Sequence, residues 1–147
     1  AKIFNYYMRK SAYSFGETGI RWIPKFLYEV PIPKIPTVQQ LPFEMLVDCI
    51  LFAKENNMET EANTLEWVVD GMVYDLYFPE EMKKGHCYIT DRITEVVKPF
   101  KADDTDAFKK EYIEKLYQFC RNDRTVFRGL IHSRNIKVVK IIEGKKK

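Results

Sequence analysis

Apolar side chains between residues 43 and 76 recur at the three- and four-residue spacing of amphipathic helices. The first stripe consists of Phe43, Leu46, Val47, Ile50 and Leu51. The second consists of Leu65, Val68, Val69, Met72, Val73 and Leu76. Pro42 would stand in the first turn of the first helix, the Asn56-Asn57 pair would end it, and Pro79 would end the second. The short polar connection predicts an antiparallel helical hairpin.

Three further helices are predicted after the hairpin. The first, around residues 89–97, is indicated by Ile89, Ile93, Val96 and Val97. Asp104 or Thr105 would cap the next helix, whose inner face would carry Phe108, Tyr112, Ile113, Leu116, Tyr117 and Cys120. Asp123 would cap the last one, with Phe127, Leu130 and Ile131 facing inward. The β-branched run over residues 136–142 predicts a short C-terminal strand.

Residues 1–36 lack helical spacing and are rich in aromatic side chains. Segments 3–8 and 20–23 are predicted as short strands joined by a turn that contains Gly16 and Gly19. The prolines at 31, 33 and 36 predict an extended linker, because each fixes its own φ and restricts the residue before it. The expected fold is therefore mainly α (α+β), with one unit over residues 1–38 and a helical domain over 39–147.

Composition narrows the class of protein. A chain of 147 residues that is 46% hydrophobic suits one domain, or a small domain with an arm. No apolar stretch is long enough to span a bilayer, and the N-terminus does not resemble a signal peptide. The three cysteines are widely spaced, which is typical of reduced thiols in a cytoplasmic protein. Ligands for a zinc site are not paired at the usual spacing, so no metal is expected. The start at Ala1 favours a piece of a longer polypeptide.

The net charge of +3 conceals a polarised distribution. Residues 1–35 carry six Lys/Arg against two Asp/Glu, and residues 105–147 carry twelve against five. Residues 36–80 carry one Lys against nine acids. Two basic ends around an acidic middle indicate a polyanionic partner. The alternative is that the acidic middle packs against the basic ends within the fold.

Motifs for catalysis are scarce. The phosphate-binding glycine loops, the nucleophile elbow and the Asn/Asp-Pro-Pro-aromatic motif of amino-methyltransferases are missing. Glu143-Gly144-Lys145 resembles half of a metal-dependent nuclease site only if it follows a strand and an Asp lies nearby. The carboxylates of the hairpin recur at helical spacing and are expected to face water, where they would not serve as acid or base; they are Glu44, Asp48, Glu61, Glu66, Asp70 and Asp75.

Cations and aromatic residues alternate in a pattern that suits nucleic acid. Cations neutralise phosphates, and tyrosine and tryptophan side chains contact sugars and bases. The N-terminal candidates are Arg9, Lys10, Tyr13, Arg21, Trp22 and Lys25. At the other end Arg121, Arg124 and Arg128 have offsets of 0, 3 and 7, which would place them on one helical face. The alternative is a solvated basic surface with the aromatic residues in the core.

Three segments also resemble a known family. They are Tyr28-Glu29-Val30-Pro31-Ile32-Pro33-Lys34-Ile35, Gln39-Gln40-Leu41-Pro42-Phe43-Glu44-Met45-Leu46-Val47-Asp48-Cys49-Ile50-Leu51 and Leu65-Glu66-Trp67-Val68-Val69-Asp70-Gly71-Met72-Val73-Tyr74-Asp75-Leu76-Tyr77. Residues 28–82 thus resemble the C-terminal region of type IIG-like restriction–modification enzymes with a TaqI-like specificity domain. Gly71 departs from the family pattern, and a glycine inside a helix costs about 1 kcal/mol relative to Ala.

The resemblance implies a parent enzyme that methylates adenine N6 in DNA with S-adenosylmethionine; it leaves open whether that parent also cleaves DNA with Mg²⁺. Residues 1–38 would be the end of the target-recognition region plus its linker. The chain itself would carry no catalytic residue and no cofactor. Its partners would be double-stranded DNA and the methyltransferase core of the same polypeptide. The basic residues would contact DNA, and the hairpin would brace the core.

Two other functions remain open from the sequence. A helical protein-interaction module would use the hairpin to contact a partner subunit and would have no role with nucleic acid. A free-standing nuclease would depend on Glu143.

Overall fold

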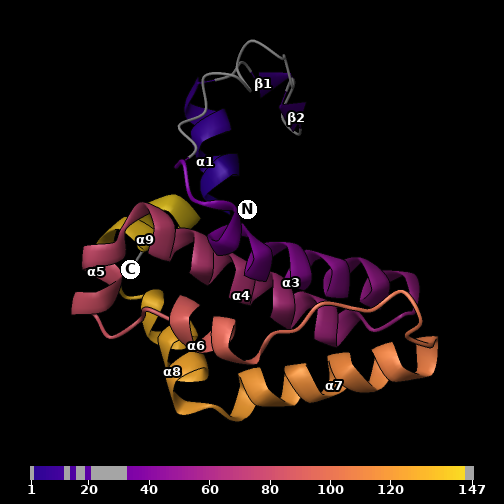
Figure 1. Ribbon diagram of the computed structural model, residues 1–147. Coiled ribbons are helices and arrows are strands. Elements are labelled where there is room, and N and C mark those ends of the chain that lie inside the picture. Colours follow the sequence, from indigo (N-terminus) through magenta and orange to yellow (C-terminus); the bar gives the residue numbers. More distant parts are fainter. Residues whose placement is uncertain (1, 12–13, 16–18, 21–32, 145–147) are drawn as a thin grey trace.

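The computed structural model describes residues 2–11, 14–15, 19–20 and 33–144, and this part of the chain is mainly helical (Figure 1). In chain order the elements are α1 (Lys2–Ser11), β1 (Ser14–Phe15), β2 (Gly19–Ile20), α3 (Thr37–Glu55), α4 (Glu59–Tyr77), α5 (Pro79–Lys84), α6 (Thr90–Val96), α7 (Asp106–Asn122), α8 (Arg124–Ser133) and α9 (Lys137–Glu143). The two-residue strands β1 and β2 pair antiparallel. No helix in the described ranges is both long and apolar enough to cross a bilayer.

The predicted hairpin is present as α3 and α4. The first helix ends at Glu55, just before the Asn56-Asn57 pair, and Asn57 has a positive φ of 60°. However, α3 begins at Thr37, so Pro42 lies inside the helix and not in its first turn. The apolar stripe is also rotated from the predicted one: Val47 and Leu51 are 43% and 55% exposed, whereas Cys49 and Ala53 are buried. These smaller side chains belong to the main core cluster.

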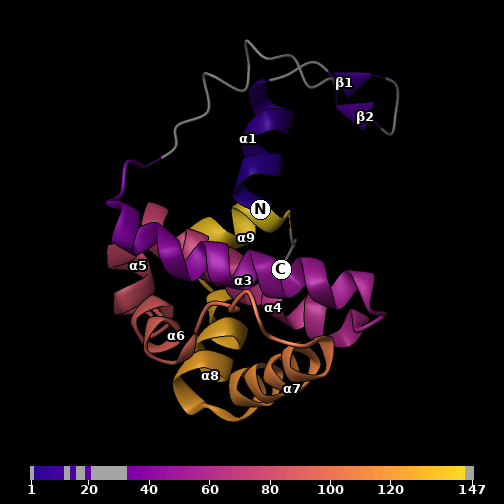
Figure 2. The ribbon, with the colours of Figure 1, turned by 45° about the vertical axis from the view of Figure 1, so that its right-hand side comes forward.

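Helix α4 is the centre of the molecule. It contacts α1, α3, α5, α6, α7 and α8, and its buried face includes Leu65, Val68 and Met72. Figures 1 and 2 show α7 and α8 on one side of the α3–α4 pair and α1 and α9 on the other. The main core therefore lies between the hairpin and α6–α8. A smaller apolar cluster joins the C-terminal end of α4 to α5 and α9, around Tyr74, Met82, Cys87 and Val139.

Ile89, just before α6, is fully enclosed between two helical glycines. A Cβ on Gly129 of α8 would lie 2.7 Å from Ile89 Cγ2 and 3.3 Å from the carbonyl oxygen of Cys87. A Cβ on Gly71 of α4 would lie 3.0 Å from both Ile89 Cδ1 and Leu130 Cδ2. The glycine that departs from the family pattern thus has a packing role, because it lets α8 and the segment before α6 approach α4.

The three predicted downstream helices are α6, α7 and α8, and both predicted caps are observed. Thr105 caps α7 by accepting a hydrogen bond from the backbone N–H of Phe108, at 3.1 Å. Asp123 caps α8 by accepting one from Val126, also at 3.1 Å. Each cap satisfies one of the N–H groups that a helix N-terminus leaves without an intrahelical partner. The short helix α5 is an addition that the sequence pattern did not indicate.

Two strand predictions are wrong. Residues 3–8 belong to helix α1, whose Ile3 packs into the smaller apolar cluster beside α9. Residues 136–142 fall largely in helix α9, which fully buries Val139 and half-buries Ile142 three residues later. β-propensity mainly reflects how a side chain fits a sheet, and here the apolar residues bury against helices at helical spacing. The predicted strand over 20–23 lies, apart from Ile20, outside the described residues.

The two predicted units are in contact. Helix α1 belongs to the predicted N-terminal unit, yet it packs against α9 and α4 of the predicted helical domain. Residues 33–36 have no regular structure, and Pro36 has the extended geometry expected for the linker, with φ −57° and ψ 150°.

Replacement of the two packing glycines tests this arrangement. Gly129→Ala should lower the free energy of unfolding by about 1 to 3 kcal/mol, because the new methyl group meets Ile89 and a backbone carbonyl. Gly71→Ala should cost less, since its methyl group meets only the ends of side chains that can move. Urea unfolding of both variants and the wild type measures the difference. A stabilising Gly129→Ala, as helix propensity alone predicts, would contradict the packing described.

Candidate nucleic-acid interface

Three arginines predicted to contact DNA gather where α7 meets α8. Arg121 lies in the last turn of α7, and Arg124 and Arg128 lie one turn apart on α8. The helix is interrupted at Asp123, so these residues do not share one continuous helical face as expected. They nevertheless line a single open hollow of about 570 Å³, together with Asn122, Asp123, Phe127, Ile131 and His132. We call these lining residues the α7–α8 surface.

The acid in this surface is already paired. Asp123 Oδ2 accepts a hydrogen bond from Arg92 Nε at 3.0 Å and forms an ion pair with Arg92 Nη2 at 2.9 Å, while Oδ1 caps α8. Partial burial alone would raise the pKa of Asp123, but the hydrogen bond from Val126 and the charge and hydrogen bonds of Arg92 hold it below its usual value. Arg121, Arg124 and Arg128 are exposed and form no salt bridge with any residue in the described ranges. The surface therefore keeps a net positive charge.

Aromatic rings lie against the cations of this region. The Arg121 guanidinium lies over the Phe127 ring, with 4.9 Å between its carbon and the ring centroid. Phe127 meets Trp67 of α4 edge to face, with 6.3 Å between centroids. Arg134, just after α8, lies over the Trp67 ring at 4.6 Å. Two adjoining rings thus lie between two cations, in the order Arg121, Phe127, Trp67, Arg134, which we call the arginine–aromatic ladder.

The N-terminal candidates are not part of this surface. Arg9 and Lys10 belong to α1, which lies across the α3–α4 pair from α8 (Figures 1 and 2). Their side chains, and all of Tyr13, Arg21, Trp22 and Lys25, lie outside what the structure describes. Helix α1 and the α7–α8 surface therefore occupy different sides of the molecule.

The acidic residues of the hairpin are not uniformly solvated. Glu44 and Asp48 are exposed as expected, but Glu66 and Asp70 are half-buried and have polar partners. Lys54 pairs with Glu66, and the backbone N–H of Lys2 donates to Asp70 Oδ1 at 3.1 Å. Burial raises the pKa of Asp70 in spite of that hydrogen bond. Asp75 is only 2% exposed, so the prediction that it faces water is wrong.

Asp75 connects α4 to the start of α6. Its Oδ2 accepts hydrogen bonds from the backbone N–H groups of Ile89 and Thr90, each at 3.0 Å, and from the Thr90 hydroxyl at 2.6 Å. Its Oδ1 is buried, without a hydrogen-bond partner in the described residues. Burial raises the pKa of Asp75 to about 6, and the hydrogen bonds from Thr90 and Ile89 limit the rise. The carboxylate acts as a structural bridge, since its Oδ2 accepts three hydrogen bonds from Ile89 and Thr90.

Glu143 does not fit the nuclease pattern. It ends helix α9 rather than a strand, so the geometric basis for a Glu-x-Lys half-site is lost. Its carboxylate accepts a hydrogen bond from Tyr74 Oη at 3.1 Å and pairs with Lys2 Nζ at 3.4 Å. Within the described ranges no three His, Cys, Asp or Glu side chains are grouped so that they could hold a metal ion.

The cysteines are buried and are not activated as nucleophiles. Burial raises the pKa of both Cys49 and Cys120 to about 12, with a smaller effect from the nearby carboxylates of Asp48 and Asp123. Burial also raises the pKa of Cys87. A thiolate nucleophile needs a lowered pKa, so none of the three is suited to covalent chemistry.

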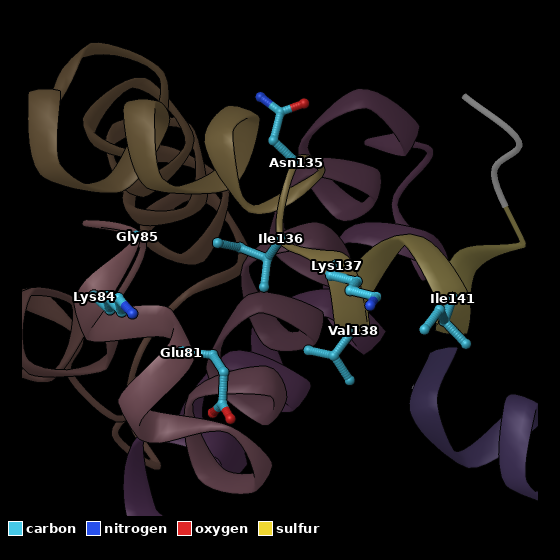
Figure 3. A pocket seen from close by; sticks show the side chains of 8 residues that line it. All are labelled: Glu81, Lys84, Gly85, Asn135, Ile136, Lys137, Val138 and Ile141. Atoms are coloured by element: carbon cyan, nitrogen blue, oxygen red, sulfur yellow. The ribbon is translucent and has the colours of Figure 1, made fainter.

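A second hollow, of about 470 Å³, lies between α5 and α9 (Figure 3). Ile136 and Val138 face Glu81 of α5 across it, and Ile141 lies farther along α9 towards α1. Gly85 also lines it, and a Cβ at that position would lie 2.4 Å from Ile136 Cδ1. This hollow is largely apolar and lacks the gathered arginines of the α7–α8 surface.

Sequence reasoning missed part of the interface. Arg134 belongs to the same basic segment as Arg124 and Arg128, and that proximity could have identified it. Trp67 lies 60 residues before Phe127, and only the packing of α8 on α4 brings the two rings together. No signal local to Trp67 predicts this contact.

Comparison with protein-family models, with curated proteins and with solved structures found no match to this chain. A function therefore has to be inferred from the surface chemistry described above.

The buried Asp75 predicts a specific pH dependence of stability. The pKa of Asp75 is about 6 in the folded protein and exceeds the ordinary value of 3.8. The folded state therefore binds a proton at this carboxylate more tightly than the unfolded state does. The contribution of Asp75 to the free energy of unfolding should therefore rise by about 1 kcal/mol as the pH falls from about 7.5 to about 5. Asp75→Asn, which does not titrate, should lack this rise.

Urea unfolding of the wild type and Asp75→Asn across this pH range isolates the effect, because all other carboxylates are common to both proteins. Parallel pH profiles would contradict the raised pKa.

Proposed function

We propose that this chain is a DNA-engaging scaffold segment of a restriction–modification adenine-N6 DNA methyltransferase, and that the α7–α8 surface contacts the DNA backbone. The observation that supports this most strongly is the gathering of Arg121, Arg124 and Arg128 around one hollow whose carboxylate is already paired with Arg92. Exposed guanidinium groups bind phosphate oxygens in bidentate fashion and release counterions.

The parent enzyme in this proposal supplies the chemistry. The resemblance over residues 28–82 assigns S-adenosylmethionine, and Mg²⁺ if the parent cleaves DNA, to parts of the polypeptide outside this chain. Within the described residues the thiols are buried, and Asp75, Asp123 and Glu143 have structural partners, which supports a binding role for this chain. The proposed partners are double-stranded DNA and the methyltransferase core.

The hairpin offers a second surface for the core of the parent. Val47 and Leu51, about one turn apart on α3, are 43% and 55% exposed. In the proposal this apolar side of α3 braces the catalytic core.

The same exposed side chains favour a second candidate function, a helical protein-interaction module with no role with nucleic acid. The two functions differ in one measurable property, since only the first predicts binding to DNA with a strong dependence on salt.

Charge reversal tests the DNA-binding proposal. Arg124→Glu/Arg128→Glu should weaken binding to a generic duplex at about 50 mM salt and should reduce the slope of log affinity against log salt by about 1 to 2, because each phosphate contact contributes about 0.9. Fluorescence anisotropy from about 50 to about 300 mM salt measures both quantities.

Lys101→Glu/Lys110→Glu is the matched control. It changes the net charge by the same amount but lies at the link before α7 and in the N-terminal part of that helix, remote from Arg121 at its C-terminal end. The control should retain most of the affinity and the wild-type slope. Absence of duplex binding by the wild type at about 50 mM salt would contradict the proposal, as would equal losses in the two variants.

A further inference from the structure

The arginine–aromatic ladder contains two aromatic rings in addition to the positive charge that binding to a duplex backbone requires. Phosphate contacts come from cations, polar side chains and backbone N–H groups, and they do not require phenylalanine or tryptophan rings. Here the guanidinium carbons of Arg121 and Arg134 lie over the rings of Phe127 and Trp67 respectively. Both arginines are exposed, so their guanidinium groups are accessible to a ligand.

Arg92 shows what a closed arrangement of the same type looks like. Its guanidinium lies over the Phe119 ring at 5.1 Å, but its three nitrogens bond to the carboxylates of Asp123 and Glu95. Arg121 and Arg134 form no salt bridge with a carboxylate in the described ranges. Each guanidinium carbon lies close to an aromatic ring, while the nitrogens remain available to a ligand.

A guanidinium group placed in this way suits an unpaired base. Bases whose faces are not covered by neighbours stack on aromatic rings and on arginine planes, and this stacking tolerates any sequence. In a duplex the base faces are stacked on each other and only edges and backbone are accessible. The contact between Phe127 and Trp67 places both planes along one continuous ladder, beside Arg124 and Arg128, which would hold phosphates.

We propose, on the basis of the DNA-binding function above, that this surface binds single-stranded DNA more tightly than duplex, with unpaired bases stacked on the guanidinium planes of Arg121 and Arg134. The ligand class is a strand segment of a few nucleotides whose phosphates meet Arg124 and Arg128. The occupied region runs from the end of α7 along α8 to Trp67 of α4.

Charge-conserving variants separate stacking from phosphate binding. Arg121→Lys/Arg134→Lys keeps both charges but removes the planar groups. Its affinity for a single-stranded oligonucleotide of about 16 nucleotides should fall about tenfold. Its affinity for a duplex should change by less than about twofold, because the number of cations is unchanged. Fluorescence anisotropy at one salt concentration measures both, and thermal melting verifies that the variant is folded.

A second test variant and a matched control accompany Arg121→Lys/Arg134→Lys. Phe127→Leu removes the ring beneath Arg121 with every charge retained and should weaken only single-strand binding. Phe52→Leu is the matched control. Phe52 also has an edge-to-face neighbour, Phe100, and a nearby cation, Lys109, but it lies outside the ladder. Its replacement should leave the affinities for single strand and duplex unchanged.

The outcomes distinguish this inference from the proposed function. If the wild type binds duplex at least as tightly as single strand, or if Arg121→Lys/Arg134→Lys weakens both equally, base stacking is overturned while DNA binding stands. If the wild type binds neither, both proposals fail. Selective loss of single-strand binding in Arg121→Lys/Arg134→Lys and Phe127→Leu, with Phe52→Leu unchanged, supports the inference.

Discussion

The arrangement of the molecule depends on one close contact, in which Ile89 is held between Gly71 of α4 and Gly129 of α8. A side chain on Gly129 would collide with Ile89 and with the carbonyl of Cys87, so α8 reaches its position only because this residue lacks a Cβ. The carboxylate of Asp75 fixes the same segment from the other side by accepting the N–H groups of Ile89 and Thr90. The placement of α8 follows from these two interactions.

The position of α8 in turn creates the proposed interface. With α8 on α4, Phe127 meets Trp67, and Arg121 and Arg134 lie over the two rings. Asp123 follows the end of α7, caps α8 and forms an ion pair with Arg92. Arg121, Arg124 and Arg128 therefore remain exposed around one hollow, without this carboxylate as a partner. Packing, capping and charge therefore act together: the residues that determine the fold at the α7–α8 junction also determine which cations remain available to a ligand.

Local signals in the sequence predicted the elements whose spacing or capping is explicit. The stripes of the hairpin, the Asn56-Asn57 end and the caps at Thr105 and Asp123 all require only neighbouring residues. The strand predictions for the segments of α1 and α9 are wrong, because they relied on the general preference of aromatic and β-branched residues for strands. In the structure Ile3 and Val139 instead pack against other helices. The burial of Asp75 and the contact of Trp67 with Phe127 arise only from tertiary packing, so no local pattern indicated them.

The central claim is that the end of α7 and the length of α8 form the DNA-contacting surface. Mapping of amide and indole NMR shifts during titration with DNA tests this claim most directly, because it reports where the ligand binds without altering any residue. The account predicts that the largest shifts fall in residues 121–134 and at the Trp67 indole. Shifts confined to the exposed side of α3 or to α1 and α9, or none at saturating DNA, would contradict it.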